Sequence, residues 1–270
     1  MITWVELNTK SLKSQQLSVE SISYDSLDRF FQLSEYSEHT HEYCVSWIDC
    51  FAKDDQIGKG VFMRANHSET PNNLNHPQPV RQFPVPGLLG KSFPLVNKLS
   101  VLMLNSMYSL KYKGHKTYKQ NMFNFFYPLD TLTNWNNLYG AKGFYQFQCV
   151  VPFENSQEVK ALLGRIKLSK QGSFLSVLKT MGNKSSGGLI SFPRPGVTLA
   201  LDFPNKGART TRLLRELESI VVQASGAIYP AKDAHMLGST FRQSYPKWEE
   251  FTQYIDPAFS SSFWRRMEQS

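Results

Sequence analysis

Predicted strands outnumber predicted helices in this sequence and often follow one another directly, which restricts the folds that it can adopt. The clearest strand is GFYQFQCVVP at 143–152. Strands joined without an intervening helix pair most easily as antiparallel neighbours. We therefore expect an α+β fold, an antiparallel or mixed sheet flanked by helices. The other predicted strands are 2–7, 17–23, 44–50, 61–65, 173–181 and 197–203, and the predicted helices are 26–37, 95–110, 129–139, 156–168 and 209–222, with short helical pieces around Phe241 and Trp248.

The composition is that of a folded protein, with 41% hydrophobic and 19% charged residues in 270. Prolines and asparagines dominate 67–94, where we expect a long surface loop or a lid. The sequence has no run of about 18 apolar residues and no export signal at its start. Its three cysteines do not suggest a disulfide framework. We expect a cytoplasmic protein, with a peripheral position at the inner membrane face as a further option.

Several familiar motifs are incomplete. The run GLLGKS at 87–92 ends like a phosphate-binding loop, but Val85 stands where that loop needs its first glycine. The six histidines form no set of metal ligands, and no serine-hydrolase elbow occurs. The net charge of +8 suggests an anionic partner. The basic and aromatic run 111–119 would suit nucleic acid, but no recognised nucleic-acid motif accompanies it, so we expect neither a metal nor nucleic acid.

Polar residues interrupt the strands on one face. Gln146 and Gln148 share a face of the strand 143–152, opposite Cys149, which we expect to be a packed thiol. Lys179 and Thr198 repeat the pattern, as does Asp202. One explanation is a sheet with one side in water, and the other is a sheet that lines a polar pocket for a polyhydroxyl ligand such as a sugar.

A short segment near the C-terminus carries a second group of polar residues. In IYPAKDAH, which follows the helix 209–222, a short strand leads Tyr229 and Lys232 into a turn. Lys232 is either an ordinary surface charge or, beside a flavin, a cation that stabilises negative charge on the ring.

These segments carry a family resemblance. GFYQFQCVVP, SFLSVLKTMG, ISFPRPGVTLALDFP and IYPAKDAH, in that order, resemble the C-terminal half of the decaprenylphosphoryl-ribose oxidases. YCVSWIDC, QNMFNFFYPLD and YPKWEEFTQYIDP extend the resemblance over nearly the whole chain. That family lies in the vanillyl-alcohol-oxidase class of FAD-linked oxidoreductases, with the sugar-lactone oxidases.

The resemblance implies a division of the chain into three parts. Residues 1–14 would be the terminal strand of a truncated FAD-binding domain, 15–226 a substrate-binding cap domain, and 227–270 a segment that returns to the FAD domain. The glycine-rich loops that hold the pyrophosphate would lie outside this sequence. We therefore expect FAD as cofactor, with most of its binding site on an FAD-binding domain of another chain.

The resemblance also implies roles for single residues. Lys232 matches the catalytic lysine between flavin and substrate, Tyr229 matches its catalytic neighbour, and Ala231 would join Lys232 at the cofactor. Ala200 and Met181 differ from the residues of the mycobacterial members, as does Thr198, which puts the identity of the substrate in doubt. The implied substrate-binding residues are Gln146, Gln148, Tyr127, Lys179, Trp47 and Thr198.

The implied function is oxidation of a secondary alcohol of a sugar by hydride transfer to flavin. The substrate would be a sugar or sugar phosphate, with a lipid-phosphate-linked precursor of a cell-wall polysaccharide as the specific expectation. A second oxidoreductase would act on the product. The chain would be inactive without the FAD-binding half, and the alternative is a non-catalytic cap domain that binds a sugar or a partner.

Overall fold

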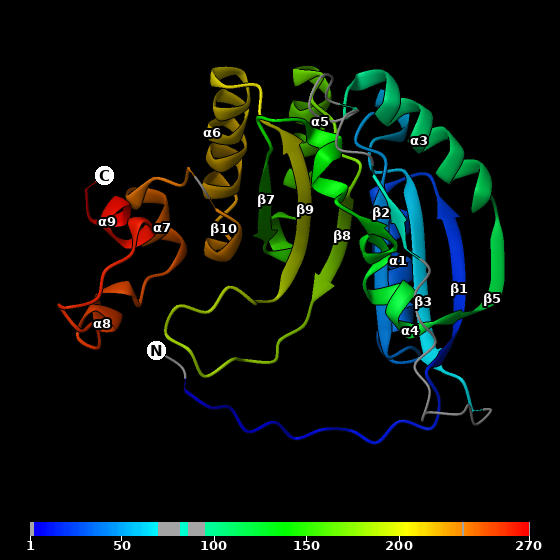
Figure 1. Ribbon diagram of the computed structural model, residues 1–270, viewed down its shortest axis with the longest axis horizontal. Coiled ribbons are helices and arrows are strands. Elements are labelled where there is room, and N and C mark those ends of the chain that lie inside the picture. Colours follow the sequence, from blue (N-terminus) through cyan, green and yellow to red (C-terminus); the bar gives the residue numbers. More distant parts are fainter. Residues whose placement is uncertain (1–2, 70–81, 86–94, 234, 270) are drawn as a thin grey trace.

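The computed structural model describes residues 3–69, 82–85, 95–233 and 235–269. Most of the proline-rich segment 67–94 and the whole of GLLGKS lie outside the described residues. One eight-stranded sheet, in the order β10-β7-β9-β8-β2-β3-β1-β5, runs through the molecule (Figure 1). Its strands are β1 (Gln16–Tyr24), β2 (Tyr43–Ile48), β3 (Gly60–His67), β5 (His115–Asn121), β7 (Phe144–Val151), β8 (Ser176–Met181), β9 (Gly196–Pro204) and β10 (Ala227–Ile228).

Each neighbouring pair in this sheet is antiparallel, which confirms the expected α+β fold. The smaller strands β4 (Phe83–Pro84) and β6 (Leu132–Thr133) form a separate parallel pair. The α-helices are α1 (Leu27–Glu38), α3 (Lys98–Lys111), α4 (Met122–Phe126), α5 (Glu158–Ser169), α6 (Ala208–Gln223), α7 (Gly238–Ser244), α8 (Trp248–Thr252) and α9 (Ser262–Gln269).

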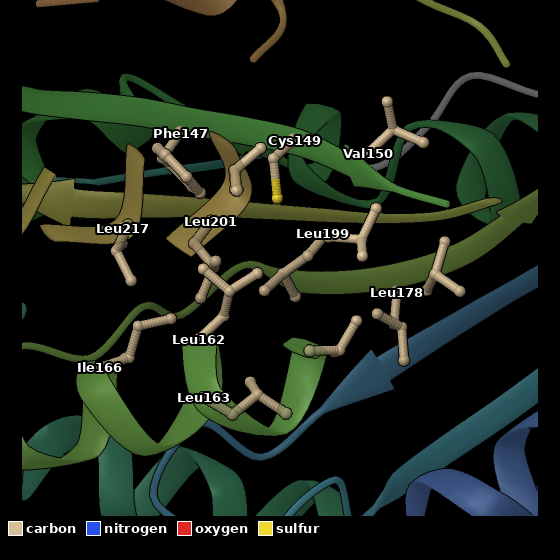
Figure 2. Close-up of a cluster of buried hydrophobic side chains, with 14 of the residues drawn as sticks. Phe147, Cys149, Val150, Leu162, Leu163, Ile166, Leu178, Leu199, Leu201 and Leu217 are labelled. Atoms are coloured by element: carbon tan, nitrogen blue, oxygen red, sulfur yellow. The ribbon is translucent and has the colours of Figure 1, made fainter. Parts of the chain in front are cut away.

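Helices α1, α5 and α6 cover one face of the sheet, where most of the core lies. Register brings Cys149, Leu199 and Leu178 side by side on β7, β9 and β8. These side chains pack toward Leu162 and Leu163 of α5 (Figure 2). Cys149 is fully buried and reduced, as predicted for a packed thiol.

Local chemistry explains where the first helices begin. The Ser26 hydroxyl accepts a hydrogen bond from the Arg29 amide at 3.3 Å and caps α1, as the sequence predicts. Asn97 caps α3 through the amides of Leu99 and Ser100, and the Ser100 hydroxyl accepts from the Asn97 amide in return. This reciprocal cap fixes the start of α3 at Lys98.

Two expected elements differ in the structure. The strand expected at 2–7 is wrong over its described part, because residues 3–13 form no strand and Trp4 is 78% exposed. An alternating pattern makes a strand only where a neighbouring edge takes its hydrogen bonds. The single helix expected at 129–139 is instead two 3-10 turns, Pro128–Thr131 and Trp135–Tyr139, separated by β6. Asn134 between them has a left-handed φ of 57°, which ends helical hydrogen bonding.

Removal of one core side chain tests this packing. We expect Leu162→Ala to lower the free energy of unfolding by about 3 kcal/mol, because a fully buried side chain leaves a cavity. Leu168→Ala, on the same helix with its side chain 74% exposed, is the matched control and should change stability little. Chemical denaturation of both variants measures the difference. Equal losses would show that α5 does not pack on the sheet in this way.

Candidate functional site

The sheet face opposite α5 and α6 carries the polar residues that the sequence singled out. Gln146 and Gln148 alternate with the buried Phe147 and Cys149 along β7, so the glutamines point away from the core. Directly paired residues of antiparallel strands share a face. The register therefore shows which side chains of neighbouring strands stand beside the two glutamines.

One cross-strand row joins the four strands that carry predicted pocket residues. Gln148 pairs with Ala200, Ala200 with Val177, and Val177 with Trp47. Trp47 is buried, and its ring lies 4.7 Å from the ring of Tyr108. We call the residues Gln148, Ala200, Val177 and Trp47 the Gln148 row. Because Ala200 and Val177 are short, Gln148 and Trp47 bound a shallow stretch of the sheet between them.

Thr198 and Lys179 stand next to this row. The Gln148 side-chain amide donates a hydrogen bond to the Thr198 hydroxyl at 3.2 Å, and Thr198 is paired with Lys179 on β8. Thr198 is buried, whereas Lys179 is exposed. Partial desolvation of its ammonium group still lowers the pKa of Lys179. The structure therefore places one cation and two amides on the same face.

The turn predicted from IYPAKDAH lies at the outer edge of β7, where the short strand β10 pairs with one end of that strand. β10 pairs with Val150 and Cys149, and the Tyr229 amide then donates to the Gln148 carbonyl at 2.8 Å. The Tyr229 ring stacks on Phe192 with 4.5 Å between centroids. The next residues form the 3-10 turn Pro230–Lys232, in which Ala231 and Lys232 are both exposed. Backbone pairing thus fixes this turn beside Gln148.

The enclosed space beside the turn is small. A cavity of about 20 Å³ lies between β7, α6 and the turn, room for about one water molecule. Gln146, Gln148 and Lys232 line it together with the ionisable residues Glu218, Asp233 and His235. A sugar would therefore have to bind on the open sheet face rather than in this cavity.

Asp202 belongs to the polar pattern noted in the sequence but was not among the predicted site residues. It is paired with Gln146 on β7, is only 3% exposed, and has an Oδ2 atom that finds no hydrogen-bond partner among the described residues. Burial raises the pKa of Asp202 to about 6, although a hydrogen bond from Gln146 and the charge of Lys232 lower it. Its place in the polar pattern of β9 was visible in the sequence, but its burial was not. A carboxyl group with this pKa can accept or release a proton near neutral pH.

Tyr127 is not brought to this group. It follows α4, its side chain is 55% exposed, and its ring lies 6.4 Å from that of Phe126. No hydrogen bond or ring contact joins it to the Gln148 row within the described part of the chain. Its role in a pocket stays a prediction, as do the roles assigned to the other site residues.

No cluster of three or more histidine, cysteine, aspartate or glutamate side chains among the described residues could hold a metal ion.

None of the helices in the described ranges is both long enough and apolar enough to cross a lipid bilayer.

The raised pKa of Asp202 predicts a pH-dependent stability. The folded state holds the proton of Asp202 more tightly than the unfolded chain, so stability is lost as the pH rises from about 4 through about 6. Asp202→Asn removes this loss. We expect the unfolding free energy of the variant, relative to the unmodified protein, to increase by about 2–3 kcal/mol between about pH 4 and about pH 8.

Denaturant titrations across this pH range measure the difference. Asp55→Asn, which changes an exposed aspartate, is the control for the substitution and should change stability little. A pH-independent difference for Asp202→Asn would contradict the raised pKa.

The chain is similar in sequence to known proteins, and its fold is weakly similar to solved structures. No protein-family model matches the chain. The chain is 33% identical over 247 residues to the decaprenylphosphoryl-beta-D-ribose oxidase of Mycolicibacterium smegmatis, a match covering 87% of this chain and 53% of the relative. An uncharacterized Streptomyces coelicolor protein, described by its position in the mprA 5′ region, is 25% identical over 243 residues, covering 84% of this chain and 66% of that protein.

Solved structures show weaker similarity. A chitooligosaccharide oxidase has a TM-score of 0.46 at 10% identity, covering 90% of this chain and 53% of that structure. CrmK, a flavoenzyme of a shunt-product recycling mechanism in caerulomycin biosynthesis, has a TM-score of 0.45 at 8% identity, covering 92% and 55%. The chain spans about half the length of the first curated relative. Over most of its own length, this chain therefore resembles about half of a decaprenylphosphoryl-ribose oxidase.

Proposed function

We propose that this chain is the substrate-binding part of an FAD-dependent oxidoreductase that oxidises a secondary alcohol of a sugar. The observation that supports this most is the placement of Gln146, Gln148 and Lys232 side by side at one edge of the sheet, because the sequence separates the glutamines from the lysine by more than eighty residues. A relative with 33% identity is named as a ribose oxidase.

The polar face suits a ligand with many hydroxyl groups. A glutamine amide both donates and accepts hydrogen bonds, so it can bind a sugar hydroxyl in either sense. Gln148 uses one amide hydrogen on Thr198, and Gln146 bonds Asp202, so both amides are held in place before a ligand arrives. Such pre-orientation supports selection of one face of a sugar ring.

The turn that carries Lys232 suits the reactive end of a flavin. When bound, FAD would supply the acceptor for the hydride that leaves the sugar carbon. Ala231 and Lys232 are exposed on the turn. The cation of Lys232 can stabilise negative charge that develops on a flavin bound beside it. We place the remainder of the FAD-binding site on an FAD-binding unit outside the described residues.

The reaction also releases a proton from the alcohol that becomes a carbonyl group. Asp202 lies next to Gln146, and its Oδ2 atom has no partner in the described structure. With a pKa near 6, its carboxylate is largely ionised at neutral pH and can hold that proton. Tyr229 is fixed against Phe192 and β7. Its role is to hold the turn in place, not to accept the proton.

Two further features support a lipid-phosphate-linked sugar. Lys179 supplies a cation beside the Gln148 row for a phosphate group. An apolar hollow of about 500 Å³ adjoins Pro230 in the turn and can take an apolar chain. A substrate of this kind would hold the protein at a membrane surface, and a second oxidoreductase would act on the carbonyl product. The hollow is lined by Ile190, Pro230, Phe241, Phe251, Phe263 and Trp264, among others.

Flavin reduction tests this function. The chain is combined with FAD and the gene product encoded immediately upstream, and the visible flavin band is followed without oxygen as lipid-linked or free pentose phosphates are added. We expect Lys232→Ala to slow bleaching of this band by about 100-fold or more without loss of stability, because Lys232 is exposed.

Lys247→Ala replaces another lysine of the C-terminal segment and is the matched control, which should leave the rate unchanged. Unchanged bleaching by the Lys232 variant would remove Lys232 from the reaction. Sugar binding without any flavin reduction would instead favour a non-catalytic binding protein.

A further inference from the structure

Helix α3 presents apolar side chains to solvent along its whole length. Leu99, Leu102, Met103, Met107 and Leu110 are between 36% and 71% exposed, and we call these five residues the α3 stripe. At 100° per residue they fall within an arc of about 140° on one side of the helix. A continuous exposed apolar stripe of this kind marks a surface that contacts another protein, a ligand or a membrane.

The other side of α3 is firmly attached to the protein. Val101 is fully buried, the Asn105 side-chain amide donates a hydrogen bond to the Asp49 carboxylate, and Tyr108 packs on Trp47. The Asn97 cap fixes the first turn. These contacts determine the rotation of the helix about its axis. The α3 stripe therefore faces outward as a consequence of the fold, and it is not a frayed segment that lacks a core.

The sequence segment that contains α3 carries charge of one sign. Residues 70–129 contain no aspartate or glutamate but seven lysines and arginines, so this segment carries +7 of the net charge of +8. Lys98 and Lys111, at the two ends of α3, lie on opposite flanks of the apolar arc. In the turn and edge strand that follow, Lys113, Lys116 and Lys119 are exposed. The cations of the segment are Arg81, Lys91, Lys98, Lys111, Lys113, Lys116 and Lys119.

We propose that α3 lies in the surface of an anionic lipid bilayer, with the α3 stripe among the acyl chains and the flanking lysines at the lipid phosphates. An apolar arc bordered by lysines is the pattern of helices that lie in a membrane interface. Anionic headgroups attract each nearby lysine, which a second copy of this chain cannot do, because it would bring the same positive segment against the first. The apolar stripe also has no counterpart in nucleic-acid binding.

This inference deepens the proposed function, because it rests on the membrane position proposed there and names the surface responsible. The two can fail separately. Vesicle binding is measured without FAD or sugar, so a failure of the oxidation chemistry would leave it unchanged. Equally, an oxidase that does not bind vesicles would retain its flavin chemistry.

Co-sedimentation with vesicles tests the proposal. The full chain is mixed with phosphatidylcholine vesicles that contain about one-third phosphatidylglycerol, or none. We expect binding to the anionic vesicles alone, and weaker binding as salt rises from about 0.1 M to about 0.5 M. Met103→Glu with Met107→Glu should weaken binding about tenfold or more, and so should Lys113→Gln with Lys116→Gln.

Leu168→Glu is the matched control, because it places the same charge on an exposed apolar position of α5 and should leave binding unchanged. All five positions are exposed, so the variants should fold, which circular dichroism checks. The proposal is overturned if the unmodified chain does not bind anionic vesicles, or if the Met103 and Met107 changes leave binding intact. It is also overturned if those changes only dissociate a dimer in solution.

Discussion

The antiparallel register of β7 and β9 is the constraint on which the rest of the structure depends. Eight consecutive residue pairs fix it, from Phe144 with Pro204 to Val151 with Val197. A slip by one residue would turn Phe147, Leu199 and Leu201 toward the open face and the glutamines into the core. The hydrophobic packing on α5 and α6 therefore also determines that Gln146 and Gln148 face outward. Core stability and the polar face are set by the same hydrogen-bond ladder.

Much of the fold could be predicted from the sequence because its strands have strong alternation and clear ends. Every strand expected between residues 17 and 203 is present, and the helix before IYPAKDAH begins and ends within one residue of its expected bounds. Each failure arises where a local pattern does not determine the partner or the backbone conformation of a segment. Residues 2–7 alternate like a strand, but pairing depends on a partner that local pattern does not report. Likewise, Asn134 breaks the helix expected at 129–139 through its backbone conformation.

The sequence predicts the site residues whose direction follows from strand alternation. It does not predict properties that depend on burial, such as the pKa of a side chain. Gln146, Gln148, Thr198 and Lys179 follow from alternation and register together. Asp202 follows the same alternation, yet its raised pKa arises from the surrounding structure, which no linear pattern contains. Tyr127 was predicted as a pocket residue, but it lies just after a five-residue helix. The loop conformation there, rather than a strand pattern, sets the direction of its side chain. Single residues on loops are the least predictable part of such a site.

The contact between Tyr108 and Trp47 fixes a distance as well as an orientation. Trp47 belongs to the same cross-strand row as Gln148, three strands away, which is roughly 14 Å at about 4.8 Å per strand. Helix α3 at a membrane surface would thus hold the glutamines at a set distance from that helix. A ligand held at the bilayer would then have to extend over that distance to reach the polar face. The width of the sheet between Trp47 and Gln148 would then set the distance between the lipid surface and the polar face.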